Sequence, residues 1–330
     1  MRRWLSEKLD DAMLPFLKLI SPGYRRRLGP FRPAQPADLQ GLAFIPAPDD
    51  LQLSRDSAWN GYHMSGYAFS SPYEAGQPED KIVSGRLLEV SATAPWVVIV
   101  PGYGIGSLPP YGYSVHQNIQ GRSLLERGMN VALLDPPFHK SRKRRGCRSG
   151  EGFFSPDLAQ TQHAVRQAAA DVVALVRWLE RRSDQAVGLW GTSLGGCIAG
   201  LVSTLLPDLA GVVLMEPLDN PGDALALLPG SHEIRSVVTR HGFRPGDIPT
   251  QLRTVAPSAH QPAIPLEHLL FVTPLWDRVV PVHLQEAFWE AWGRPPRICR
   301  NAGHLTLAID RTAAAAAAEF LAGRLLSPAL

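Results

Sequence analysis

The chain has 330 residues, of which 45% are apolar, so it can bury a large core and is too apolar to be disordered. Its net charge of +3 gives no general argument for a nucleic-acid partner. Three widely spaced cysteines, Cys147, Cys197 and Cys299, match neither a disulfide framework nor a zinc pattern. They favour a reducing compartment, so we expect a cytoplasmic protein.

Residues 1–60 are predicted to form an N-terminal extension. Apolar side chains recur at helical spacing over residues 1–20, which predicts an amphipathic helix with a break near Pro15. Its charges are of both signs, so we expect it to pack on its own domain, with a weak membrane-surface contact as the alternative. Prolines crowd residues 15–48 and predict an extended arm. No apolar run reaches the roughly 18 residues that a membrane-spanning helix needs.

Residues 61–330 are predicted to form one α/β domain. Buried apolar strands alternate with helices, which is typical of a mostly parallel sheet covered on both faces. Residues 217–265 lack a clear strand and predict a small helical cap over the carboxyl edge of the sheet. The predicted strands are residues 62–70 and 81–90 (a hairpin), 96–100, 131–134, 186–190, 211–215, 268–273 and 297–300. The predicted helices are residues 115–127, 155–182 (capped by Ser155), 197–206, 282–292 and one from about 305.

The sequence Gly191-Thr192-Ser193-Leu194-Gly195 lies where a buried strand passes into an apolar helix. In this setting a serine sits on a strained turn, its hydroxyl projects above the sheet edge, and unpaired N–H groups lie beside it. The two flanking glycines leave room where a Cβ would clash with a neighbouring strand or helix. The motif is short, and an ordinary joint with a capping serine is the alternative interpretation.

A serine hydroxyl needs a base to take its proton, and the base needs a group that orients it. Asp277 and His304 each follow a later predicted strand, and the chain order Ser, Asp, His is the order that this arrangement requires. These positions predict Ser193 as nucleophile, His304 as base and Asp277 as its partner. Glu216 ends the strand 211–215 and competes for the role of the acid, or else is a carboxylate near the pocket.

The oxyanion of such a reaction needs two hydrogen-bond donors. We expect the backbone N–H groups of Leu194 and of Tyr103, in the glycine-rich loop 101–106. Similar loops occur in methyltransferases and dinucleotide-binding proteins, but Ser107 stands where the dinucleotide motif needs its third glycine. Pro101 likewise stands where a methyltransferase usually has an acidic residue. We therefore expect neither a metal nor an organic cofactor.

Four motifs resemble the α/β-hydrolase superfamily, over about residues 92–326: the strand followed by Pro-Gly-Tyr-Gly, the Gly-Thr-Ser-Leu-Gly-Gly turn, Asp-Arg-Val-Val-Pro and Ala-Gly-His. The chain is most similar to esterase-like members related to dienelactone hydrolases and prolyl-oligopeptidase-type catalytic domains. The resemblance implies the α/β-hydrolase fold and the same roles for Ser193, Asp277, His304, Leu194 and Tyr103. Many members begin the oxyanion loop with His-Gly, where this chain has Pro-Gly.

Residues 140–148 carry six Lys or Arg in nine positions. A solvated loop is the plain interpretation, and an acidic substrate, a nucleic acid or an anionic membrane is the alternative. Some members of the family carry a Pro-aromatic-His-x-x-Arg segment here. Because the preceding strand should end near the active site, we expect His139 and Arg142 to point inward, with Arg142 binding a carboxylate or phosphate of the substrate.

These observations together predict a serine hydrolase that cleaves an ester or a related acyl bond of a small molecule. An acyltransferase with the same triad is one alternative, and a non-catalytic binding protein that kept the fold is another. The sequence predicts neither the acyl group nor the oligomeric state.

Overall fold

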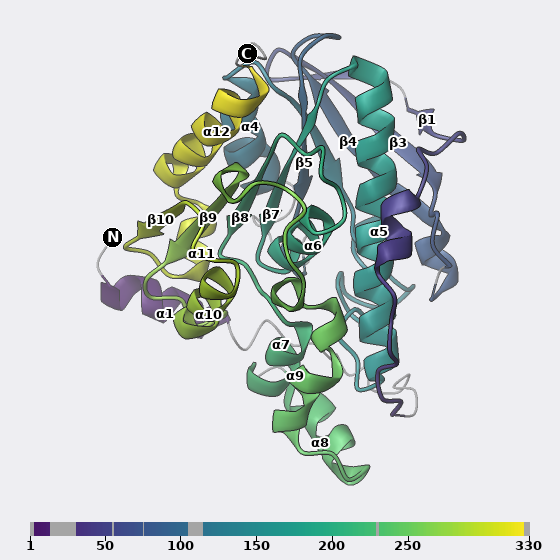
Figure 1. Cartoon of the computed structure of the whole chain (residues 1–330), viewed down its shortest axis with the longest axis vertical. Coiled ribbons are helices and arrows are strands. Elements are labelled where there is room, and N and C mark those ends of the chain that lie inside the picture. The colour runs from purple at the N-terminus through teal and green to yellow at the C-terminus, as the bar shows by residue number, and fades with distance from the viewer. Residues whose placement is uncertain are drawn as a thin grey trace.

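The computed structural model describes residues 3–13, 31–54, 56–74, 76–104, 115–228 and 231–326. In this part of the chain, one ten-stranded sheet runs through the molecule (Figure 1). Its spatial order is β1 (Gln52–Leu53), β3 (Tyr62–Ser70), β4 (Ile82–Glu89), β6 (Asn130–Leu134), β5 (Trp96–Val100), β7 (Val187–Thr192), β8 (Gly211–Met215), β9 (Leu269–Pro274) and β10 (Arg297–Arg300), with β2 (Ser57–Trp59) paired to β3. Strands β6 to β10 along this order are parallel, whereas β1 to β4 pair antiparallel.

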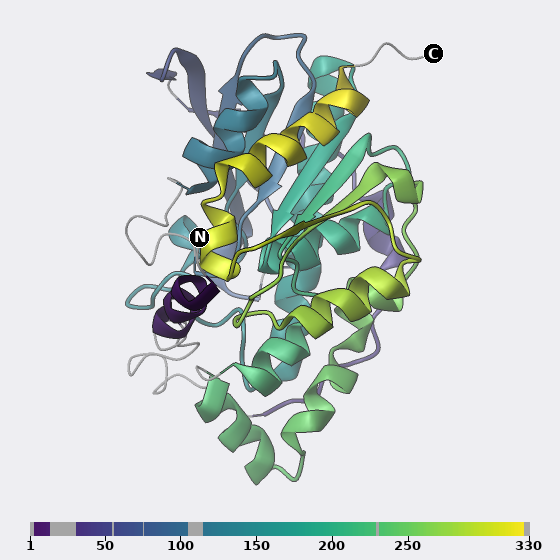
Figure 2. The same cartoon turned by 90° about the vertical axis from the view of Figure 1, so that its left-hand side faces the viewer.

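Helices cover both faces of this sheet (Figure 2). One face carries α5 (Leu158–Ser183), α6 (Leu194–Ser203) and α10 (Val282–Ala291), and the other carries α4 (Arg122–Leu125) and α12 (Arg311–Leu325). Successive side chains of a strand point to opposite faces. In β5, Val98 and Val100 accordingly enter one hydrophobic cluster, and Val97 and Ile99 enter the other. A strand buried on both faces must be apolar throughout, which is why the sequence shows an unbroken apolar run.

Each predicted strand is found within two residues of its expected bounds, while the short β1 and β2 were not predicted. The prediction that Ser155 caps the long helix is wrong, because Asp157 accepts the Gln160 N–H and α5 begins at Leu158. The single C-terminal helix expected from residue 305 is two helices, α11 (His304–Ala308) and α12. Asp310 separates them, since its carboxylate caps the first turn of α12.

The N-terminal helix is present as α1 (Arg3–Met13), and it lies beside α11 in both views. The proposed break at Pro15 and much of the proline-rich arm lie outside the described residues. From residue 31 the arm is extended apart from a short turn, η1 (Gln40–Phe44). Among the described helices, none has the length and apolar character needed to cross a membrane.

The cap predicted over residues 217–265 is helical in its described part. It holds α7 (Pro221–Leu227), α8 (His232–Arg240) and α9 (Ile248–Gln251), joined by short 3-10 turns, and it projects below the sheet in Figure 1. Because β8 ends at Met215, the cap starts directly at the carboxyl edge of the sheet. The same edge carries the turn from β7 into α6.

That turn is unusually tight. Ser193 has φ 55° and ψ −115°, a left-handed backbone conformation that costs energy in a non-glycine residue. A Cβ on Gly195 would lie 1.9 Å from the carbonyl oxygen of Val100, and one on Gly191 would lie 2.2 Å from that of Gly195. The expectation that both glycines leave space for neighbouring backbone is therefore confirmed.

We expect Gly195→Ala to destabilise the protein by about 1–3 kcal/mol or more, because the backbone contacted by the new methyl group cannot rotate away. Urea unfolding would measure this loss. Gly41→Ala is the matched control, since a Cβ there meets nothing within 4 Å. Equal unfolding free energies for the two variants would contradict the steric explanation.

Candidate active site

Ser193, His304 and Asp277 form one hydrogen-bonded chain. Nε2 of His304 lies 3.1 Å from Oγ of Ser193, and Nδ1 lies 2.7 Å from Oδ2 of Asp277. In the tautomer that donates from Nδ1 to the carboxylate, Nε2 is able to accept the serine proton. The structure thus brings together the three residues that the sequence placed on separate loops. It leaves Ser193 half-buried at the wall of a cavity.

The carboxylate of Asp277 is held by its own loop. Its Oδ1 accepts the N–H groups of Val279 and Val280, both at 2.8 Å, and Gln285 of α10 donates to Oδ2 at 2.9 Å. Such bonds favour the charged carboxylate and fix its direction. Asp277 is thereby oriented toward His304. No sequence pattern indicated a role for Gln285.

Buried carboxyl groups surround His304. Burial alone would lower the pKa of this imidazole, but the charge of Asp277, with Glu216, Asp10 and the hydrogen bond to Asp277, raises it above its ordinary value of 6.5. Burial also raises the pKa of Glu216 well above the usual carboxyl range. Among the carboxyl groups around His304, Asp277 raises the pKa of the imidazole most.

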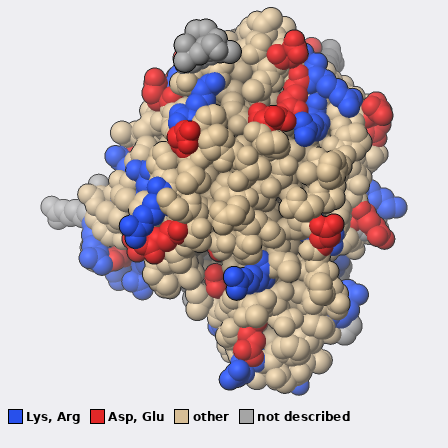
Figure 3. All heavy atoms as spheres, in the orientation of Figure 1, with Lys and Arg blue, Asp and Glu red and all other residues tan. Residues whose placement is uncertain are grey.

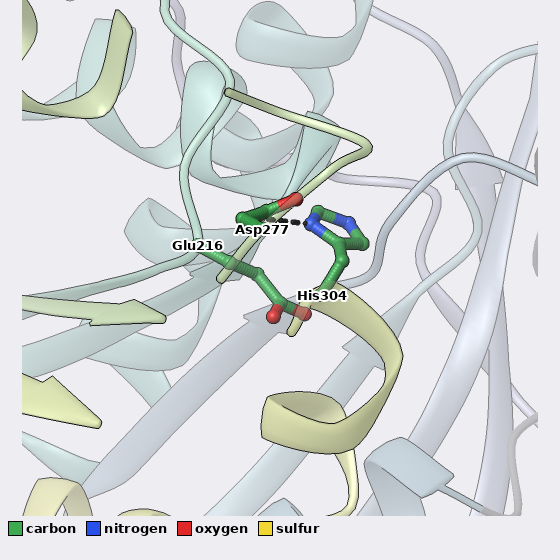
Figure 4. Close-up of side chains that lie close together, drawn as sticks. All are labelled: Glu216, Asp277 and His304. Atoms are coloured by element: carbon green, nitrogen blue, oxygen red, sulfur yellow. Dashed lines mark hydrogen bonds and ion pairs between the residues drawn. The ribbon is translucent and has the colours of Figure 1, made fainter. Parts of the chain in front are cut away.

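Glu216 lies beside Asp277 and His304, and Figure 4 shows both carboxyl groups next to the imidazole side chain. Its Oε2 is buried without a hydrogen-bond partner among the described residues. Because Nδ1 of His304 bonds Asp277, the geometry favours Asp277 over Glu216 as the orienting acid. The ligand atoms of these three residues lie within 4.8 Å of one another, but a metal would have to break the bond between Asp277 and His304.

The predicted oxyanion loop lies close to the nucleophile. A Cβ on Gly102 would lie 3.3 Å from Cβ of Ser193, and both Tyr103 and Leu194 line the same cavity. Leu194 is the first residue of α6, so its N–H has no acceptor within the helix. The two residues expected to supply the backbone donors therefore line the cavity beside Ser193.

His139 supports this loop from behind. It is fully buried, its Nε2 accepts the N–H of Gly104 at 3.0 Å, and its Nδ1 donates to the carbonyl of Pro137 at 2.8 Å. Tyr103 packs edge-on against its ring. Burial lowers the pKa of His139 to about 4, so the ring is neutral at pH 7. The structure places His139 behind the oxyanion loop rather than on the cavity wall.

Arg142 does not reach the cavity. Its guanidinium is buried and forms ion pairs with Asp171 at 2.8 Å and Asp80 at 3.5 Å. It also donates to the backbone carbonyls of Asp135 and Asp80. These contacts tie the end of β6 to α5, and they leave the guanidinium enclosed within the protein. The expected contact between Arg142 and an anionic substrate therefore finds no support in the structure.

The described residues form a cavity of about 410 Å³ that opens beside Ser193 and His304. Most of its lining side chains are apolar, and many of them come from the cap, the loop after Asp277, α10 and α11. They include Leu218, Ala224, Leu227, Val280, Leu284 and Leu305. Its polar lining includes His116, Glu151, Asp223 and the exposed Arg148, which the sequence did not single out. Of these, Arg148 lies in the basic segment 140–148.

Comparisons with known proteins agree with this architecture. A family model described as the alpha/beta hydrolase fold matches residues 95–233. Two uncharacterized proteins of Mycobacterium tuberculosis, from strains CDC 1551 / Oshkosh and ATCC 25618 / H37Rv, are each 28% identical over 226 residues. The match covers 66% of this chain and 51% of each relative, so the chain spans about half the length of the curated relatives it matches.

Solved esterase structures share the fold. The acetyl xylan esterase from Paenibacillus sp. R4 has a TM-score of 0.63 at 14% identity, over 93% of this chain and all of that chain. Acetyl xylan esterase 1 from Thermoanaerobacterium sp. JW/SL YS485 has a TM-score of 0.56 at 14% identity, over 84% and 99%. A cold-adapted esterase from an Arctic intertidal metagenomic library has a TM-score of 0.54 at 14% identity, over 82% and 98%. The chain has the α/β-hydrolase fold, and the resemblance expected from its motifs is confirmed.

The neutral His139 makes the protein sensitive to acid. Between pH 6.5 and about 4 the unfolded imidazole binds a proton that the buried one does not, so stability is lost as the pH falls through this window. The contribution is about 3 kcal/mol at most. We expect His139→Gln to lose less unfolding free energy than the wild type between pH 7 and pH 4.5 in urea titrations.

His232→Gln, at an exposed histidine, is the control and should keep the wild-type dependence on pH. If His139→Gln loses as much stability on acidification as the wild type does, His139 is not held neutral.

Proposed function

We propose that this protein is a serine hydrolase that cleaves a carboxylic ester or a related acyl bond through an acyl-enzyme on Ser193. The hydrogen-bonded chain from Ser193 through His304 to Asp277 is the observation that carries this proposal. It lies at the wall of a cavity large enough for a small ligand. A binding protein that kept only the fold has no use for all three groups in this order.

The first half of the reaction forms the acyl-enzyme. His304 takes the proton of Ser193 at Nε2 while Oγ attacks the carbonyl carbon, and Asp277 stabilises the imidazolium that results. The backbone N–H groups of Leu194 and Tyr103 would stabilise the negative oxygen of the tetrahedral intermediate. His304 then returns its proton to the leaving alcohol. The bond between the acyl carbon and the oxygen of the leaving alcohol breaks, and the acyl group stays on Oγ of Ser193.

The second half releases the acid. His304 removes a proton from water, the water oxygen attacks the acyl carbon, and the proton returns to Oγ of Ser193 as the acid leaves. An alcohol in place of water gives acyl transfer by the same steps, so product analysis with an added alcohol separates the two reactions. None of these steps draws on a metal or an organic cofactor.

The cavity supports an apolar small-molecule substrate. Its apolar wall is formed partly by α7 of the cap, and the scissile bond would lie beside Ser193 at one end. Three proteins with this fold are named as esterases, which supports an ester in preference to other acyl bonds. Neither the acyl group nor the alcohol is specified by these features.

The expected partners and location stay predictions. Figure 3 shows one face of the molecule on which positive and negative side chains are interspersed, without a broad area of either sign. This is consistent with the expectation of no nucleic-acid partner, which a salt-dependent retention on DNA would contradict. A cytoplasmic location and a weak membrane contact through residues 1–20 likewise rest on the sequence.

We expect Ser193→Ala to lower kcat for short-chain p-nitrophenyl esters by at least about 10⁴-fold, because the nucleophile is gone. Labelling by a fluorophosphonate probe should be lost as well. Ser203→Ala is the matched control on the same helix, since its hydroxyl bonds only the nearby carbonyl of Gly200 in the described structure. A wild-type protein that neither hydrolyses any ester of a C2–C12 panel nor takes up the probe would refute the proposal.

The pH profile of kcat/KM should report His304. The imidazole must be neutral to accept the serine proton, and its raised pKa keeps it protonated beyond pH 6.5. Activity should therefore rise with pH, with the half-maximal point above pH 6.5, and should be lost as the pH falls. Asp277→Asn should move this point to lower pH and reduce kcat by about 10⁴-fold. A wild-type half-maximal point below pH 6 would contradict this electrostatic account.

A further inference from the structure

The N-terminal helix α1 touches the segment that carries the catalytic base. Asp10 and His304 are 294 positions apart in the sequence, yet α1 and α11 lie side by side in Figures 1 and 2. The helix is otherwise peripheral, with Trp4, Leu5 and Leu9 exposed to solvent. Ser6 and Asp10 are its exceptions, because both side chains are fully buried, and of the two only Asp10 is an acid.

Three backbone N–H groups converge on the carboxylate of Asp10. Its Oδ2 accepts from His304 at 2.8 Å and from Arg278 at 3.1 Å, and its Oδ1 accepts from Leu305 at 3.1 Å. Arg278 directly follows Asp277. One carboxylate therefore bonds the backbone of the loop that carries Asp277 and the backbone of the segment that carries His304. Bonds from N–H groups to a charged, buried acceptor are among the stronger hydrogen bonds in proteins.

The local packing is built around this contact. A Cβ on Gly303 would lie 2.7 Å from Oδ2 of Asp10, so glycine before His304 leaves the space that the carboxylate occupies. Asp11 adds an ion pair to the Arg278 side chain at 2.6 Å. Thr306 of α11 donates to the hydroxyl of Ser6 at 3.3 Å. The contact thus involves several residues on each side.

We infer that Asp10 is a positioning residue for catalysis. Through this side chain, α1 holds the loop of Asp277 and the segment of His304 in fixed positions relative to each other, and so completes the active site. The inference rests on the proposed function. Asp10 does not line the cavity, so it should act on turnover rather than on substrate binding. A shift of about 1 Å between reacting groups can cost about 100-fold in rate.

The test is the kinetics of Asp10→Asn in the full chain. The amide is nearly the same size but replaces one of the two acceptor oxygens by an –NH₂ group, so at least one of the three N–H donors loses its acceptor. We expect kcat for a p-nitrophenyl ester to fall about 10- to 100-fold, with KM changed by less than about 3-fold. Glu7→Gln is the matched control, because it removes one negative charge from the same helix at a residue paired with Arg3. It should match the wild type.

The pH profile gives a readout that a purely structural role would not move. The titratable groups that face His304 are Asp277, Glu216 and Asp10, and the charged Arg278 lies next to Asp10. Loss of the Asp10 charge should move the acidic limb of kcat/KM to lower pH, since one carboxylate that favours the imidazolium is gone. Glu7→Gln should leave the limb in place.

A second variant covers the case in which Asp10→Asn does not fold. Gly303→Ala keeps the Asp10 carboxylate, but the new methyl group would occupy the space that this carboxylate fills beside His304. This variant should show the same loss of kcat at nearly constant KM. Amide hydrogen exchange at His304 and Leu305 should be faster in either variant, whether or not an ester is hydrolysed.

The outcomes separate the two proposals. If both variants fold and keep the wild-type kcat and pH profile while Ser193→Ala is inactive, the role of Asp10 is refuted and the proposed function stands. If the wild type hydrolyses no ester, the proposed function fails first, and hydrogen exchange alone decides whether Asp10 holds the His304 segment.

Discussion

The site depends on one close approach, between the start of α6 and the end of β5. Gly195 lies against the backbone of Val100 and Pro101 with no room for a side chain. The same approach sets Ser193 beside Gly102, so the proposed nucleophile and the proposed oxyanion loop are neighbours before any substrate binds. The carbonyl of Ser193 also accepts the N–H of Leu218, which connects the strained turn to the first residues of the cap. Strain at the serine is thus held by backbone contacts on two sides.

Around this turn the protein concentrates buried charge. Three carboxyl groups lie around His304, and their environments differ. Amide N–H groups and Gln285 donate to Asp277, three amide N–H groups donate to Asp10, and burial raises the pKa of Glu216. A buried charge is costly unless it is paired and hydrogen-bonded. The cluster is therefore more consistent with a role in chemistry than with a contribution to stability. The second buried cluster, around Arg142, has its charges paired within the protein, and neither Arg142 nor its partners Asp80 and Asp171 are among the residues that line the cavity beside Ser193.

The sequence predicted the features that local patterns encode. Apolar runs located the long strands, and the positions of Ser193, Asp277 and His304 after strands located residues that meet in space. Other features depended on partners far along the chain. Arg142 is enclosed by Asp80 and Asp171, and no local pattern distinguishes it from a solvent-exposed arginine in a basic loop. His139 points behind the oxyanion loop because Gly104 and Pro137 supply its two hydrogen bonds. Asp157 and Ser155 can both cap a helix, and only the start of α5 decides between them.

The contact between α1 and α11 also has a consequence for the timing of synthesis. A ribosome adds about 5–20 residues per second, so roughly 15–60 s separate the emergence of Asp10 from that of His304. The sheet from β3 to β8 can assemble during this interval. The segments that carry Asp277 and His304 are made only near the end of the interval. The turn at Ser193 would be in place early, and α1 would stay undocked until the segment of His304 has been made. A nascent chain would therefore hold a folded sheet in which Ser193 still lacks His304 and Asp277, and the hydrogen-bonded chain of these three residues could form only after His304 has emerged.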